Sequence, residues 1–202
     1  VIASMLFSVT AYAGGMIGIK AGYGELDANK LGYTAGGTTY AAKSAKVDSG
    51  YGAIFAEINV GDTPISLGVE RVPMDAVLSV DGNSADSSLT VSDMTTIYAL
   101  GAYPVSDVVN IFVKAGYTAA DIGSVKTRDG TTVNKFDDSL EGPTAGVGIQ
   151  VGQQGGFIGR LSYEFTDFDT VAVTTTSNGS ASVVKKAESE ISLISISVAK
   201  SF

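Results

Sequence analysis

Residues 157–166 read FIGRLSYEFT, and apolar and polar side chains alternate along this stretch apart from Ile158. The two faces of the segment are Phe157, Gly159, Leu161, Tyr163 and Phe165 against Arg160, Ser162, Glu164 and Thr166. Alternation with a period of two is typical of a β-strand whose faces meet different surroundings. The segment therefore predicts a strand with one apolar, aromatic-rich face and one polar face that carries charges.

Seven further segments show the same alternation, and they predict an all-β chain of eight strands. They are residues 16–24, 50–60, 65–72, 94–105, 109–119, 144–152 and 191–202. Residues 94–105 are apolar on both faces, so the register of that strand stays open. In the last segment the alternation changes phase between Leu193 and Ile194, which indicates a β-bulge there or a misassigned register.

The connections between these segments alternate between short and long. Short, turn-like connections fall at residues 61–64, 104–108 and 153–156, where glycine, proline and polar residues gather. Long polar connections fall at residues 25–49, 73–93, 121–143 and 167–190. An up-and-down antiparallel arrangement then has every long loop at one end and every tight turn at the other. That distribution is typical of a transmembrane β-barrel in the bacterial outer membrane.

The composition excludes several kinds of chemistry. The 202 residues include no histidine and no cysteine, so imidazole bases, thiol nucleophiles, disulfides and the common zinc sites are excluded. With 21 acidic and 13 basic residues the net charge is −8, which argues against nucleic acid as a partner. We expect no cofactor and no metal site.

The polar faces of the predicted strands carry a balanced set of charges among small residues. The set comprises Lys20, Glu57, Glu70, Lys114, Arg160 and Glu164. The interior of an eight-stranded barrel is just wide enough for side chains to fill it, and opposite charges there would pair. We therefore predict an interior charge network, which either plugs the lumen or acts as a gate.

The apolar faces would then meet lipid. Aromatic residues on those faces would form a girdle near the membrane interfaces: Tyr23, Tyr103, Tyr117, Tyr163 and Phe165. The alternative is a soluble β-sandwich that carries the six charges on a wet face.

Residues 1–13 read VIASMLFSVTAYA, an uncharged apolar stretch that ends in small residues around a tyrosine. This is typical of the apolar region and cleavage site of a secretory signal peptide. We predict a residual signal peptide over residues 1–13 and one barrel domain over residues 14–202. In the alternative reading, residues 5–13 form a strand of the mature fold.

Three segments carry a resemblance to a known family: NIFVKAGY at residues 110–117, GRLSYEF at residues 159–165 and ISLISISVAKSF at residues 191–202. Together with the signal-like start and the loop order, the chain resembles the eight-stranded outer-membrane barrels of Gram-negative bacteria, the OmpA barrel domain and OmpX-like porin family. The resemblance implies an outer-membrane location at the cell surface. It also implies that Phe202 belongs to an assembly signal read by the barrel-assembly machinery.

Enzymes with this architecture that we know of rely on a histidine, so we expect no enzymatic activity. The acidic pairs in the long connections are Asp137 and Asp138, near Glu141, and Asp167 with Asp169. We interpret them as solvating charge.

The expected function is a structural, surface-presenting barrel whose loops serve adhesion or interaction. Expected partners are outer-membrane lipid and lipopolysaccharide, whose phosphates could meet Arg71, Lys185 and Lys186, and a host or phage surface ligand. Two alternatives remain open. One is a narrow passive or gated pore for small ions and solutes, and the other is a soluble secreted β-sandwich or self-assembling surface protein.

Overall fold

A computed structural model describes most of the chain after residue 13. It covers residues 14–30, 33–35, 38–40, 43–73, 76–80, 87–126, 132–136, 139–176 and 183–202. The predicted signal segment, residues 1–13, lies outside these ranges. Within these ranges no helix is long and apolar enough to cross a membrane.

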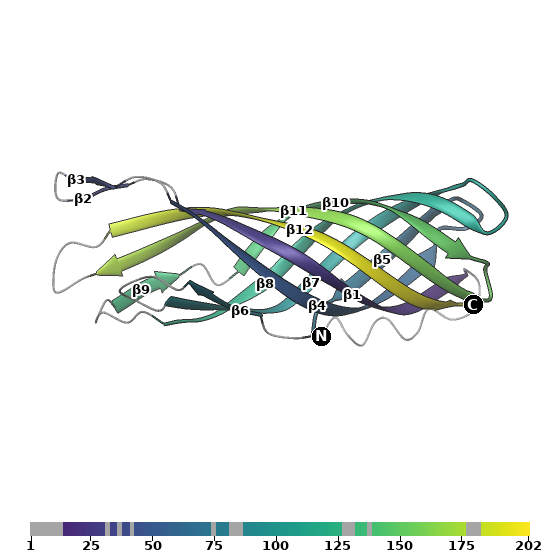
Figure 1. The fold of residues 1–202 in the computed structure, drawn as a ribbon, viewed down its shortest axis with the longest axis horizontal. Coiled ribbons are helices and arrows are strands. Elements are labelled where there is room, and N and C mark those ends of the chain that lie inside the picture. The colour runs from purple at the N-terminus through teal and green to yellow at the C-terminus, as the bar shows by residue number, and fades with distance from the viewer. Residues whose placement is uncertain are drawn as a thin grey trace.

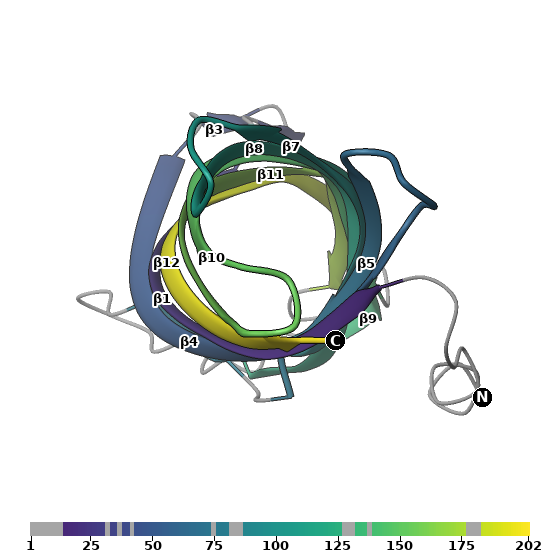
Figure 2. The same ribbon diagram turned by 90° about the vertical axis from the view of Figure 1, so that its right-hand side faces the viewer.

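Eight long strands form the wall of a closed, all-antiparallel barrel. They are β1 (Gly15–Lys30), β4 (Lys43–Asn59), β5 (Ile65–Arg71), β7 (Ser87–Pro104), β8 (Val109–Lys126), β10 (Ser139–Gly152), β11 (Phe157–Thr176) and β12 (Val183–Ser201). Each pairs with its neighbours along the chain, and the β1–β12 ladder closes the ring (Figure 2). The predicted eight-stranded barrel is confirmed, and the soluble β-sandwich is wrong.

The predicted long loops are wrong in part, because strands occupy much of their length. β1, β4, β7, β8, β11 and β12 run well beyond the predicted ends. Four short strands lie in the same regions: β2 (Tyr33–Ala35), β3 (Thr38–Tyr40), β6 (Ala76–Val80) and β9 (Thr132–Phe136). β2 pairs with β3, β6 with β7 and β9 with β11. These stretches are polar but rich in threonine and valine, which favour extended backbone.

The short connections are tight turns, as predicted, and all lie at the end of the barrel that holds Phe202 (Figure 1). In the first, Gly61 takes a φ of 56°, and in the third, Gly155 takes a φ of 79°. Both values lie in the left-handed region that glycine adopts without strain. The long extensions project from the opposite end, which we call the rim.

The backbone registers settle both questions that the sequence left open. In β7, Tyr98 and Leu100 are buried inside the barrel, while Ile97 is 64% exposed on the outside. In β12, the ladder with β1 runs without a shift through Leu193 and Ile194, so of the two alternatives the β-bulge is wrong. Leu193 points inward over Gly24, where a Cβ would collide with its side chain. A glycine on the neighbouring strand thus makes room for an inward leucine.

The outer surface of the wall is an apolar belt. Large exposed hydrophobic residues occur on all eight strands, among them Ile19 at 66% and Ile196 at 65% exposure. In the predicted aromatic girdle Tyr23, Tyr103, Tyr117 and Tyr163 are exposed, whereas Phe165 is only half-exposed. A continuous apolar exterior around a polar interior is the arrangement of a barrel that faces lipid.

Candidate functional site in the barrel interior

Four inward aromatic rings fill the space that glycines leave on adjacent strands. The pairs are Tyr51 over Gly22, Phe55 over Gly18, Tyr98 over Gly68 and Phe112 over Gly148. In every pair, a Cβ built on the glycine would collide with ring atoms. These positions therefore require glycine for space rather than for turn geometry, and the rings lie close against the wall around the charged side chains.

Replacing Gly18 with alanine should destabilise the barrel by about 1–3 kcal/mol through overpacking. The new Cβ would lie 2.5 Å from Cζ of Phe55, and the Val198 carbonyl oxygen blocks the other side at 2.7 Å. Gly159→Ala is the matched control, because the nearest atom to its Cβ is 4.0 Å away. Urea unfolding in lipid vesicles should show a lower midpoint for Gly18→Ala than for Gly159→Ala. Equal midpoints would contradict the packing argument.

Arg160 and Glu57 form the first part of the charge network, toward the turn end. Arg160 Nη1 donates to Glu57 Oε1 at 2.5 Å and Nη2 donates to Oε2 at 2.8 Å, a bidentate pair. Arg160 Nε donates to Gln150 Oε1 at 2.8 Å, and the Tyr98 hydroxyl donates to Glu57 Oε1 at 2.8 Å. The guanidinium also lies 5.6 Å and 5.3 Å from the ring centres of Phe55 and Phe112. Polar and cation–π contacts together compensate the buried charge.

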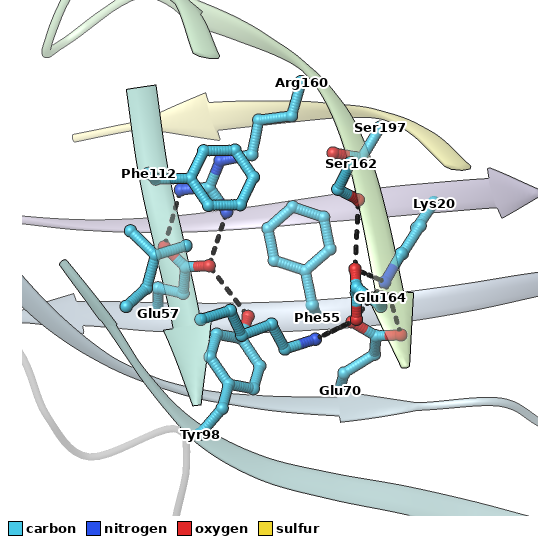
Figure 3. Close-up of a pocket in the computed structure, with 12 residues that line it drawn as sticks. Lys20, Phe55, Glu57, Glu70, Tyr98, Phe112, Arg160, Ser162, Glu164 and Ser197 are labelled. Carbon is cyan, nitrogen blue, oxygen red and sulfur yellow. Dashed lines mark hydrogen bonds and ion pairs between the residues drawn. The ribbon is translucent and has the colours of Figure 1, made fainter. Parts of the chain in front are cut away.

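Lys20, Glu70, Lys114 and Glu164 form the second part, which we call the quartet (Figure 3). Each lysine contacts both glutamates: Lys20 Nζ and Lys114 Nζ lie 3.0 Å from Glu70, and Lys114 Nζ lies 2.6 Å from Glu164. Lys20 also pairs with Glu164, and the Ser162 hydroxyl donates to Glu164 at 3.0 Å. All four side chains are buried. Alternating charges around a closed ring give every ion two partners of opposite sign.

Above the quartet, toward the rim, the interior becomes less polar. A ladder of threonine hydroxyls joins four adjacent strands, with oxygen separations of 2.5–2.8 Å: Thr96, Thr118, Thr144 and Thr166. An apolar cluster follows, made of Ala120, Leu140 and Phe168 with Met94 and Ile191 packed against it. Charge, hydroxyl and hydrocarbon thus form successive layers across the lumen.

The charge network leaves almost no free space around it. The cavity lined by these side chains measures about 20 Å³, and its lining includes all six network residues. A volume of this size holds about one water molecule. In the described structure, the middle of the lumen is therefore filled by side chains.

The structure brings all six predicted interior residues into direct contact within these two parts. Tyr98, Gln150 and Ser162 complete the hydrogen bonds of this network and are not predicted by the sequence pattern. Tyr98 lies on the strand whose register the sequence leaves open, and Ser162 lies on a polar face where a lone hydroxyl predicts no role. A glycine on the neighbouring strand is a signal that could identify Tyr98 as an inward residue. Gly68 lies directly opposite Tyr98 in the β5–β7 register, as expected when an inward ring needs space.

Other predicted residues lie outside this network. Phe202 is 62% exposed at the turn end, and its backbone exchanges two hydrogen bonds with Gly15. Arg71 pairs with Asp93 on the outer surface. Asp167 and Asp169 line an open polar hollow near the rim together with Glu188 and Glu190. Among the described residues no acidic cluster has the geometry to hold a metal ion, and Asp137 and Asp138 lie outside them.

Comparison with known proteins supports the fold. No family model matches the sequence, and no curated protein matches it either. The solved structure of the outer membrane protein OprG from Pseudomonas aeruginosa is similar, with a TM-score of 0.66 at 10% identity over 94% of this chain and 97% of that one.

Two further solved structures are similar in the same way. The outer membrane protein AlkL matches with a TM-score of 0.58 at 13% identity, over 96% of this chain and 93% of that one. The outer membrane protease OmpT from Escherichia coli matches with a TM-score of 0.50 at 11% identity, over 96% and 99%. At these identities the likeness establishes the outer-membrane barrel fold and leaves the activity open.

Proposed function

We propose that this chain, which has the fold of an eight-stranded outer-membrane β-barrel, is a non-enzymatic protein of the bacterial outer membrane with a plugged interior and a surface-presenting rim. The observation that carries the proposal is the filled lumen, in which three cations and three anions neutralise one another around a cavity of about 20 Å³. The outer belt supplies the lipid contact and the rim supplies the exposed surface.

The contacts of the network favour a plug over a conducting path. A passing ion would have to separate the bidentate Arg160–Glu57 pair or insert into the quartet. Either event leaves a buried charge without its partner, which costs several kcal/mol per ion. The apolar cluster around Phe168 adds a hydrophobic layer on the rim side. A resting lumen with these layers excludes hydrated ions.

Planar-bilayer recording tests the plug against the narrow pore. We expect the wild-type barrel to insert without steady conductance, and Arg160→Ala to produce discrete openings because it removes the guanidinium that fills the turn-side layer. Gly159→Ala, on the outer face of the same strand, serves as the matched control and should stay silent. Reproducible wild-type conductance that changes in Arg160→Ala or Glu70→Ala would instead support a gated pore.

The strand ladders at the rim support the proposal that this protein presents a surface for binding. The β1–β4 ladder continues past the exposed Tyr23 as far as Lys30 opposite Lys43, and the β11–β12 ladder continues to Thr175 opposite Val183. These ladders therefore extend the paired wall of the barrel past the exposed tyrosine toward the rim. Loops on a rigid scaffold are common carriers of recognition. The proposed binding partners of the rim are a host surface or a phage, and lipopolysaccharide is proposed to surround the barrel.

A shortened rim tests this presentation. Because Lys30 and Lys43 lie opposite each other, residues 31–42 can be replaced by Asn-Gly, which favours a two-residue hairpin and preserves the register. We expect cells that display the shortened chain to lose adhesion or phage adsorption, while heat-modifiable gel mobility stays unchanged. Equal adhesion and adsorption for both chains, and for cells without the protein, would contradict a role for this part of the rim.

A further inference from the structure

The segment that carries Lys20 occurs a second time in the chain, around Lys114. Residues 17–23 read IGIKAGY and residues 111–117 read IFVKAGY. The glutamates of the quartet follow at the same spacing, since 50 residues separate Lys20 from Glu70 and also Lys114 from Glu164. The sequence therefore contains an internal repeat, and each copy supplies one lysine and one glutamate of the quartet.

The wall divides into two halves that correspond to the two copies. The first half is β1, β4, β5 and β7, and the second half is β8, β10, β11 and β12. The halves meet at two ladders, β7–β8 and β12–β1, and a turn at residues 105–108 connects them along the chain. Each half is thus a four-stranded sheet that begins with a copy of the repeat.

The two ladders between the halves have equivalent registers. Tyr23, the last residue of the first copy, lies opposite Ile194 of β12. Tyr117, the last residue of the second copy, lies opposite Ile97 of β7. The edge of one half therefore fits the edge of the other in the same way at both ladders.

The quartet joins the halves without distinguishing between them. Lys20 pairs with Glu70 of its own half and with Glu164 of the other half. Lys114 likewise pairs with one glutamate from each half. Replacing one half by a copy of the other would keep the charges alternating around the ring, so the quartet fits any two halves.

The Arg160–Glu57 pair, in contrast, occurs once, and its carboxylate is absent from the second half. Glu57 lies opposite Met16, which directly precedes the first copy of the repeat. Gln150 lies opposite Asn110, which directly precedes the second copy. The second half therefore has an uncharged amide where the first half has a carboxylate.

The guanidinium of this pair is absent from the first half. Arg160 stands four residues before Glu164, and the residue four before Glu70 is Ser66. Two first halves together would bury two Glu57 carboxylates without a guanidinium, and two second halves would bury two guanidiniums without a carboxylate. An uncompensated buried charge strongly destabilises a fold. The pair therefore favours the union of unlike halves.

We propose that each half of the barrel can close a wall with a half from a second copy of this chain, and that the Arg160–Glu57 pair selects the half that is accepted. Within one chain the turn holds the halves close together, so the monomer is favoured by proximity. Exchange requires that the turn opens. Four extended residues span about 13 Å, and packed sheets lie about 10 Å apart, so the opened turn reaches an adjacent barrel.

Complementation between two charge-reversal variants of the full chain tests the proposal by refolding in lipid vesicles. Glu57→Arg brings two guanidiniums together and Arg160→Glu brings two carboxylates together. Each variant alone should lose its heat-modifiable fraction by about tenfold or more, because like charges are buried together. Refolded together, the first half of each variant meets the second half of the other with opposite charges. We expect the mixture to recover most of the wild-type folded fraction, as dimers in light scattering after detergent extraction.

Glu25→Lys mixed with Lys46→Glu is the matched control at an exposed ion pair. Both variants should fold alone as monomers, because exposed charges stay solvated, and mixing should add no dimer. A mixture of the buried variants that folds no better than its components, or folds only as monomers, would overturn the proposal. Wild-type folding of either buried variant alone would overturn it as well.

A disulfide across the β7–β8 ladder tests the exchange with all charges intact. Gly101 and Val113 lie opposite each other, and the chain has no cysteine of its own. A chain with Gly101→Cys, refolded together with a chain with Val113→Cys, should form a disulfide between copies whose yield rises with protein concentration. Val147→Cys, one strand further along, should replace Val113→Cys with a several-fold lower yield. Equal yields from both partners would show collision in the membrane instead of exchange and would overturn the proposal.

Discussion

Replacing Glu57 with alanine should destabilise the barrel by about 3–5 kcal/mol, because it leaves the Arg160 guanidinium buried without its counter-ion. Glu57 accepts both guanidinium hydrogen bonds and the Tyr98 hydroxyl, and its side chain is fully buried. Among the contacts described above, the side-chain oxygen of Gln150 then remains as the oxygen atom that accepts a hydrogen bond from Arg160. Urea unfolding of the protein in lipid vesicles measures the effect as a lowered midpoint.

Two controls separate charge from packing. Arg71→Ala breaks the exposed pair with Asp93 and should cost at most about 1 kcal/mol, since exposed ion pairs contribute little. Replacing both Glu57 and Arg160 with methionine removes the charges together and should recover most of the loss. If Glu57→Ala unfolds no more easily than Arg71→Ala, the Arg160–Glu57 pair is not the buried element described here.

The quartet makes the second large prediction, a strong coupling between Lys114 and Glu164. Lys114→Met leaves two glutamates facing one lysine, and Glu164→Gln leaves two lysines facing one glutamate. Each single change should cost about 3–5 kcal/mol, because an uncompensated charge stays buried. The double variant restores neutrality, so its loss should be smaller than the sum of the two.

A double-mutant cycle measured by the same unfolding assay gives the coupling directly. We expect a coupling of about 2–3 kcal/mol, at the upper end of values for contacting residues. Glu25→Gln with Lys46→Met is the matched exposed pair, and it should couple by less than about 1 kcal/mol. Additive effects in the quartet would mean that its ions are solvated independently.

The strands of the wall could be predicted from the sequence because side chains of a strand in lipid still alternate between two faces. Lipid changes only which face is which: the apolar side chains point outward and the polar side chains point into the barrel. Lys20 and Lys114 stood on faces otherwise made of small residues, so an interior location followed from their strand neighbours alone. Their exact partners did not follow. Which lysine meets which glutamate depends on the stagger of strands across the barrel, and Lys20 is separated from Glu164 by most of the chain.

The rim was harder to predict for a different physical reason. Residues such as Thr174 and Val184 lie in polar stretches that turn statistics assign to loops, but cross-strand pairing holds them in a ladder. Leu193 looked like a break in the alternation because an inward leucine is unexpected in a polar lumen. Its fit depends on Gly24 across the ladder, a relation between distant residues that local patterning does not contain.

The most direct test of the inside-out barrel is the lipid accessibility of two adjacent positions in β11. Leu161→Cys and Ser162→Cys each introduce one thiol, because the chain has no cysteine; Leu161 is 54% exposed on the belt and Ser162 is buried in the lumen. Reaction with a maleimide anchored in the lipid should be fast at position 161 and slow at position 162, with Tyr163→Cys again fast. Equal reaction rates at all three positions, or a faster reaction at 162, would contradict the account.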